Sequence, residues 1–222
     1  NLMIFELKKR IITSIFLVSL IMLMYFYSFI MVISLIIIAM IVWVEFYALI
    51  SKIIVGDFIK KKFLRLLYKS ISLLYITLLV YLILSIESYY SNLKTYLMYS
   101  VIITILSDVG GLTFGKFFKG RKLTKISPNK TISGSLGSFI FSLFLFPIFY
   151  SELIKYDLMF VILVILGVSL TAQLGDLFIS YLKRRARVKD TSDILPGHGG
   201  FLDRVDGLIF AIPMGILLFS II

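Results

Sequence analysis

The chain has 222 residues, of which 60% are hydrophobic and only 16% are charged, and its mean hydropathy is +1.04. A soluble domain of this length needs more polar surface, so these values exclude that class and predict an all-α integral membrane protein. The absence of cysteine excludes disulfides and cysteine-based metal sites. The net charge of +11 lies in short loops between apolar runs, which favours membrane orientation and anionic lipid over nucleic acid.

Apolar runs predict about seven transmembrane helices. The first run, residues 11–50, is too long for one span or for a signal peptide, and it fits two helices with a reversal near Tyr25–Phe29. The short run at 95–106 either ends there or continues through 107–114 as a glycine-broken helix. The other runs lie at 70–86, 136–150, 158–179 and 205–222. No internal repeat is present, so a single polytopic membrane domain over 1–222 is expected.

The basic residues are distributed very unevenly between the predicted loops. All but two of the 23 lysines and arginines lie in the N-terminal tail or in segments 51–69, 107–135 and 180–204. Seven spans place these segments on one side of the membrane and Lys94 and Lys155 on the other. Because basic loops stay in the cytoplasm, a bacterial-type inner (cytoplasmic) membrane protein is expected, with its N-terminus and polar motifs facing the cytoplasm.

The segment 175–187 is predicted to be a helix leaving the membrane. Four of its polar residues have helical spacing and are expected to share one face: Asp176, Ser180, Lys183 and Arg187. A carboxylate followed by a cationic stripe suits a metal ion with bound phosphates. A solvated juxtamembrane face is the alternative, above all for the arginines.

A glycine-rich turn at 196–200 contains the only histidine, His198, and precedes Asp203, Arg204 and Asp206. Glycines let backbone N–H groups approach a phosphate closely. Asp203 and Asp206 are expected to face one way if the turn starts a helix, and carboxylates near a membrane suit a hard cation such as Mg²⁺. The alternatives are a helix cap with a local Asp–Arg pair and a structural role for His198.

A second polar cluster spans residues 107–137. Asp108 is expected to end a span, either as a helix cap, as the partner of a loop cation or as a metal ligand. The loop that follows is rich in Lys, Ser, Thr and Gly, which suits a triphosphate, although it lacks the Walker spacing. Glu45, beside Trp43 near the end of the second span, is expected to snorkel to the membrane interface and is assigned no role.

The segment 180–206 resembles the signature of the phosphatidate cytidylyltransferase family at seventeen positions with fixed spacing. The matching positions are Ser180, Leu182, Lys183, Arg184, Lys189, Asp190, Ser192, Leu195, Pro196, His198, Gly199, Gly200, Phe201, Asp203, Arg204, Val205 and Asp206. Gly175-Asp176 and Ser127-Pro128-x-Lys130-Thr131-x-x-Gly134 also look like the family. Ile132 and Ser133 depart from it, since a bulky aromatic and an acidic residue are usual there. Before residue 107 the resemblance is only compositional.

The resemblance implies an enzyme that joins CTP and phosphatidic acid into CDP-diacylglycerol and pyrophosphate, using Mg²⁺ alone or with a second cation. It implies that Asp176 and Asp203 are the principal metal ligands, with Asp206 and Asp108 as further candidates. The implied catalytic residues are Asp176, Lys183, His198, Asp203 and Arg204. The implied substrate-binding residues are Ser127, Lys130, Thr131, Ser180, Arg184, Lys189, Gly199 and Gly200. The resemblance also suggests a homodimer in contact with membrane lipid.

Two rival functions remain open at this point. A CTP-dependent polyprenol kinase is a related enzyme with another lipid acceptor, and the match over 180–206 disfavours it. A transporter for an anionic solute is expected to place polar residues near the bilayer midplane. Here the polar residues gather at one predicted interface, which disfavours transport.

Overall fold

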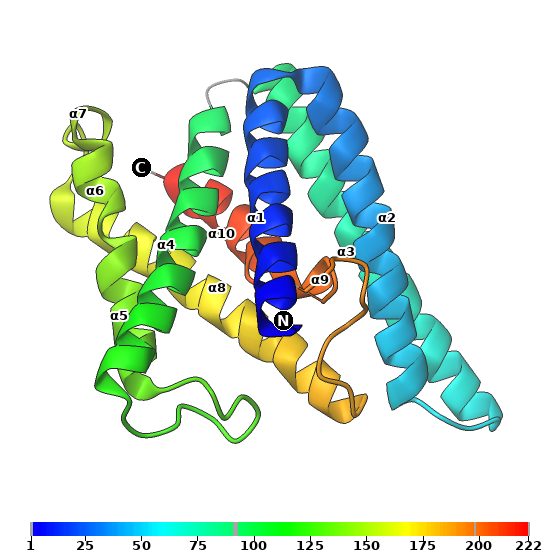
Figure 1. Cartoon of the computed structure of the whole chain (residues 1–222). Helices are drawn as coiled ribbons and strands as arrows, with labels where there is room; N and C mark the ends of the chain where they lie inside the picture. Colours follow the sequence, from blue (N-terminus) through cyan, green and yellow to red (C-terminus); the bar gives the residue numbers. More distant parts are fainter. Residues whose placement is uncertain (1, 91–92, 198, 222) are drawn as a thin grey trace. The chain divides into compact units, whose positions relative to one another are not determined.

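The computed structural model describes residues 2–90, 93–197 and 199–221, and all of its named regular elements are helices (Figure 1). The prediction of an all-α chain is therefore confirmed. The helices are α1 (Leu2–Phe26), α2 (Ser28–Ile53), α3 (Ile59–Tyr89), α4 (Lys94–Phe118), α5 (Ile132–Ser142), α6 (Leu145–Ile148), α7 (Tyr150–Leu153), α8 (Leu158–Arg185), α9 (Leu202–Val205) and α10 (Leu208–Phe219).

Four helices, α2, α3, α4 and α8, are long and apolar enough to cross a membrane. Shorter apolar helical stretches cover Ile11–Phe26 and Ile132–Ile148. Helix α10 has 12 residues and contains Pro213. The chain thus has the composition and helix lengths of a membrane protein, and the count of seven spans stays a prediction.

The helix boundaries confirm one predicted break and correct another. Helix α1 ends at Phe26 and α2 begins at Ser28, with the intervening Tyr27 extended, as predicted for the reversal in the first apolar run. Helix α4 continues unbroken past Asp108 and through the glycines that follow it. The predicted continuation of the helix through 107–114 is therefore confirmed, whereas the expectations that Asp108 ends the span and that glycine breaks the continuation are wrong.

The glycines of α4 serve packing against α5. A Cβ atom on Gly110 would lie 2.3 Å from the carbonyl oxygen of Gly137, and one on Gly134 would lie 2.9 Å from that of Gly111. Small residues let two helices approach this closely. Polar bonds reinforce the contact, since the Ser138 hydroxyl donates to a carbonyl of α4 at 2.7 Å. Close approach therefore explains why these glycines lie within a continuous helix.

The described chain forms two compact units. The first unit comprises Asn1–Glu87 and Leu182–Val205, and the second comprises Ser88–Tyr181 and Asp206–Ile222. Helix α8 contributes to both, because its residues up to Tyr181 belong to the second unit and its final turn belongs to the first.

Each unit has its own packing. In the first unit α1 lies beside α2, and the short α9 packs against α2 (Figure 1). In the second unit α4 packs against α5 and α10. The buried core of the second unit consists of Tyr99, Ile103, Leu145, Leu153, Val161, Val164, Ile165, Val168, Ala172, Ala211 and Phe219. The contact between α2 and α9 brings an N-terminal helix to the signature segment.

Candidate active site

Glu45 on α2 is a buried carboxylate of the first unit, with 2% of its surface exposed. Its Oε1 accepts hydrogen bonds from the Ser192 hydroxyl at 2.5 Å and the Phe201 N–H at 3.1 Å. Its Oε2 accepts from the Thr191 hydroxyl at 2.9 Å and the Leu202 N–H at 2.7 Å. The expectation that Glu45 snorkels outward without a role is wrong, because its carboxylate binds both ends of the segment 191–202.

Asp203 lies in the first turn of α9, and its side chain is only 4% exposed. Its Oδ1 accepts from Lys183 Nζ at 2.6 Å. Its Oδ2 accepts from the Thr191 N–H at 2.8 Å, the Thr191 hydroxyl at 2.9 Å and the Gly200 N–H at 3.1 Å. Burial raises the pKa of Asp203, but Lys183 and the two backbone N–H groups outweigh it and hold the pKa below its ordinary value. The carboxylate is therefore ionised at neutral pH.

The Thr191 hydroxyl lies between the two carboxylates. It is 2.9 Å from Glu45 Oε2 and 2.9 Å from Asp203 Oδ2. A hydroxyl carries one proton, so it donates to one of these oxygens at a time. The backbone of Gly200 packs against the same two side chains. A Cβ atom on this residue would lie 2.0 Å from the Thr191 hydroxyl oxygen and 2.7 Å from the carboxylate oxygens of Glu45. The glycine is needed because two side chains fill the space beside its backbone.

The turn before α9 closes on itself through the backbone. Leu195 and Gly199 exchange two N–H to carbonyl bonds, at 2.8 and 3.1 Å. Gly197 and Gly199 have φ angles of +77° and +81°, a region that favours glycine. His198 lies outside the described residues. The glycine-rich turn predicted from the sequence is thus present.

A second cluster surrounds Asp176 in the second unit. Lys130, at the end of the loop before α5, forms an ion pair with Asp176 Oδ2, and Ser180 donates to Oδ1 at 3.3 Å. The Lys130 and Asp176 side chains are 27% and 29% exposed. Thr131 caps α5, because its hydroxyl accepts from the Gly134 N–H at 3.0 Å. Helix α8 and the polar loop thus meet at one carboxylate.

Several of the remaining predicted residues lie in turns or are exposed. The backbone carbonyl of Ser127 accepts from the Lys130 N–H at 3.1 Å and closes a turn of the loop. The exposed Arg184 donates to the Val188 carbonyl at 3.4 Å. Lys189, Arg204 and Asp108 are also exposed.

Two details of the predicted helices are corrected. Asp206 follows the end of α9 and accepts from the Gly207 N–H at 2.9 Å, so it does not share a helix with Asp203. Arg187 lies beyond the end of α8 with a φ angle of +57°, so it does not extend the face formed by Asp176, Ser180 and Lys183. In both cases the helix ends before the residue, so the helical spacing expected from the sequence does not apply to it.

The structure divides the predicted site residues between the two units. Lys183, Gly199, Gly200 and Asp203 gather in the first unit, and Lys130, Thr131, Ser180 and Asp176 belong to the second. Within the described ranges, no group of three His, Asp or Glu side chains forms a metal cluster. A metal held here would therefore take its further ligands from substrate or water.

Sequence reasoning missed two residues of the first cluster, Glu45 and Thr191. A signal for Glu45 was available, because an ionisable residue within an apolar run is costly and marks a functional position. No signal distinguishes Thr191 from the serine and threonine residues near it.

Asp176 and Asp203 are each paired with a lysine, in a chain whose helices have the length and apolar composition of membrane spans. A sequence model of the cytidylyltransferase family matches residues 3–222, and the chain belongs to this family.

Curated relatives match part of the chain. The phosphatidate cytidylyltransferase of Bacillus subtilis is 41% identical over 121 residues, which cover 54% of this chain and 45% of the relative. That of Staphylococcus haemolyticus is 42% identical over 122 residues, covering 54% and 46%. That of Staphylococcus saprophyticus is 39% identical over 130 residues, covering 57% and 50%. The match therefore spans about half the length of each relative.

The ion pair between Lys183 and Asp203 is expected to stabilise the fold measurably. In a double-mutant cycle with Lys183→Met and Asp203→Asn, we predict a coupling free energy of about 1–3 kcal/mol, because both side chains are largely buried. The measurement is thermal unfolding of the four variants in detergent.

The matched control is the pair of Lys62 and Asp57 in the same unit. Its charged atoms are 3.8 Å apart and its side chains are 61% and 97% exposed, so solvent screens the interaction and no coupling is expected. Equal coupling in the two cycles would contradict the view that burial strengthens the site pair.

Proposed function

We propose that this chain is the catalytic part of a phosphatidate cytidylyltransferase, which converts CTP and phosphatidic acid into CDP-diacylglycerol and pyrophosphate. The observation that carries the proposal is the pairing of a lysine with a carboxylate twice, at Asp176 just before the segment 180–206 that resembles the family signature and at Asp203 within it. Membership of the cytidylyltransferase family and the printed names of the relatives support the choice of reaction.

The reaction makes modest demands on acid–base chemistry. A phosphate oxygen of phosphatidic acid attacks the α-phosphorus of CTP, a new P–O bond forms, and the bond to the β-phosphate breaks to release pyrophosphate. The nucleophile is already anionic, so no strong general base is needed. Catalysis then depends on positioning and on neutralising crowded phosphates. Lys130 and Lys183 supply such charge, and both already face carboxylates whose place a phosphate oxygen can share.

The two carboxylates fit Mg²⁺ to different degrees. Asp176 is partly exposed, and its Oδ1 accepts one long hydrogen bond. Asp203 Oδ2 accepts from two backbone N–H groups and shares the Thr191 hydroxyl with Glu45, whereas Oδ1 has Lys183 as its partner. Oδ1 is therefore the oxygen with more capacity for a cation. Such oxygens suit Mg²⁺ when substrate phosphates complete its shell. The ion would stabilise negative charge on the reacting phosphates. Asp108 and Asp206 are the next candidate ligands.

The proposed setting is the cytoplasmic side of a bacterial inner membrane. Four helices of membrane-spanning length and the uneven distribution of basic residues support it. About seven spans, a single membrane domain over 1–222 and a homodimer complete the proposal. In this setting phosphatidic acid approaches laterally from the bilayer, and CTP arrives from the cytosol.

Position-specific labelling of CTP tests the reaction directly. We expect ³²P from the α-position to enter the lipid product and ³²P from the γ-position to leave in pyrophosphate, when the detergent-solubilised chain is supplied with phosphatidic acid and Mg²⁺. ATP is expected to serve poorly. Entry of the γ-label into lipid would instead support the rival polyprenol-type kinase, and equal rates with ATP would contradict cytidylyl transfer.

The two aspartates are expected to be required for turnover. Asp176→Asn and Asp203→Asn keep the side-chain size and remove its charge, so each should lower kcat on the order of a hundredfold or more, and extra Mg²⁺ should restore little. Arg185→Gln, at a basic position outside the signature, is the control and should stay active. Near-normal turnover in both asparagine variants, at normal expression, would place the metal site elsewhere.

Cysteine labelling tests the proposed orientation, because the chain has no cysteine of its own. A cysteine at the exposed Ser151 is expected to react with an impermeant maleimide in intact cells. Cysteines at Lys62 and Asn129 are expected to react only after the cells are opened. The reverse pattern would put the polar loops outside, where CTP is absent, and would contradict the proposed function.

A further inference from the structure

Glu45 is a buried carboxylate to which the proposed reaction assigns no role. It comes from α2, far from the signature segment in sequence, and it is 2% exposed. A buried carboxylate is costly unless its oxygens receive hydrogen bonds. Here each oxygen lies within hydrogen-bond distance of one hydroxyl and one backbone N–H group, and the Thr191 hydroxyl is shared with Asp203.

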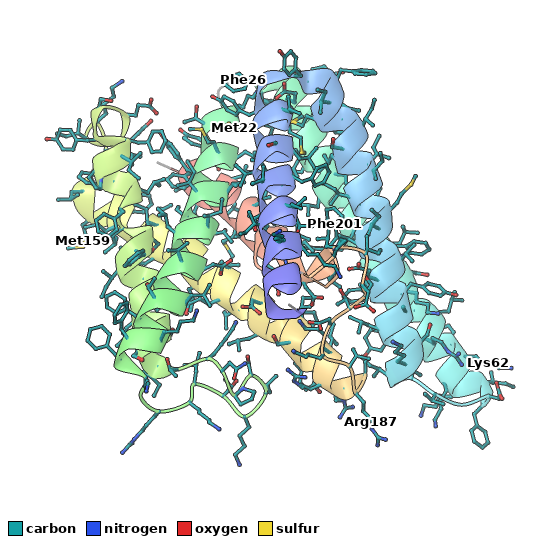
Figure 2. All side chains as sticks on the ribbon, in the orientation of Figure 1. Met22, Phe26, Lys62, Met159, Arg187 and Phe201 are labelled. Carbon is teal, nitrogen blue, oxygen red and sulfur yellow. The ribbon has the colours of Figure 1, made fainter. Side chains whose placement is uncertain are left out.

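The four donors come from the two ends of one segment. Thr191 and Ser192 donate from its beginning, and Phe201 and Leu202 donate from its end. Figure 2 labels Phe201 at the start of the turn into α9. A single side chain therefore closes the segment 191–202, which includes the glycine-rich turn.

The same segment holds Asp203. The N–H groups of Thr191 and Gly200 both donate to Asp203 Oδ2, next to the hydroxyl and peptide groups that donate to Glu45. Moving Thr191 or the 200–202 turn would therefore displace the donors of Asp203. We infer that Glu45 is a positioning residue, which fixes the segment 191–202 and through it the orientation of Asp203. This inference rests on the proposed function for its catalytic consequence.

The bonding pattern requires a carboxylate rather than an amide. Glutamine would keep one accepting oxygen, but its NH₂ group would face a backbone N–H that can only donate, even if the neighbouring hydroxyl turns to accept. That backbone N–H, left buried without an acceptor, weakens the closure even though Glu and Gln have nearly the same size. Aspartate keeps both acceptors and is shorter by one methylene, so it should restore part of the effect.

The test uses a reporter cysteine in the cysteine-free chain. Leu195 lies within the segment and is 5% exposed, so Leu195→Cys should react slowly with maleimide. We expect Glu45→Gln to accelerate this labelling about tenfold or more, and Glu45→Asp to give an intermediate rate. A cysteine at the exposed Ile194 reports reagent access and should react equally in all variants.

Glu87→Gln is the matched control. Glu87 is a carboxylate of the same unit and accepts from the Ser28 hydroxyl at 2.5 Å, away from the signature segment. Its replacement should leave Leu195→Cys labelling unchanged. Ser192→Ala, which removes one of the four donors, supplies a milder variant if Glu45→Gln does not fold.

Kinetics on the cysteine-free variants separate positioning from simple loss of structure. Glu45→Gln should lower kcat about tenfold or more and leave KM for CTP within about twofold, with partial recovery in Glu45→Asp. Unchanged Leu195→Cys labelling would overturn the inference, as would fast labelling with normal kcat. If the chain with Glu45 intact shows no transferase activity, the proposed function is refuted. The labelling of Leu195→Cys, with and without Glu45→Gln, still decides whether Glu45 closes the segment.

Discussion

The segment 191–202 is held between two carboxylates, Glu45 and Asp203, and the Thr191 hydroxyl lies 2.9 Å from each. Both carboxylates are nearly buried, and their oxygens are met by hydroxyls, backbone N–H groups and Lys183. Partially satisfied buried networks are costly, whereas satisfied ones specify a single arrangement. The position of Asp203 therefore depends on a contact between the N-terminal half of the chain and the signature segment.

Helix α8 contributes one residue to each of the two lysine–aspartate pairs. Asp176 lies within α8, where Lys130 from the loop before α5 meets it, and Lys183 in the last turn of α8 meets Asp203. The glycine contacts between α4 and α5 hold the loop's end, since Thr131 caps α5. The proposed phosphate-handling role rests on the repeated use of lysine beside aspartate, and the family match suggests its substrates.

The sequence predicts the helical class and the break near Tyr27 because both depend on composition and local spacing. It fails where tertiary contacts override local preference. The glycines after Asp108 read as helix breakers, but their lack of side chains allows α5 to pack closely and the helix continues. Fixed spacing in the signature identified Asp203 and Lys183, whose partners are near in sequence. Glu45 was missed because its partners lie about 150 residues away along the chain.

Hydrogen exchange of backbone amides tests the held segment most directly. The N–H groups of Thr191, Gly200, Phe201 and Leu202 all donate to one of the two carboxylates. In the intact chain in detergent, these four amides should exchange at least about a hundredfold more slowly than free peptide amides, since exchange requires the segment to open. Exchange of Phe201 and Leu202 at the rate of free peptide amides would contradict the account, because Glu45 would then not be holding the turn.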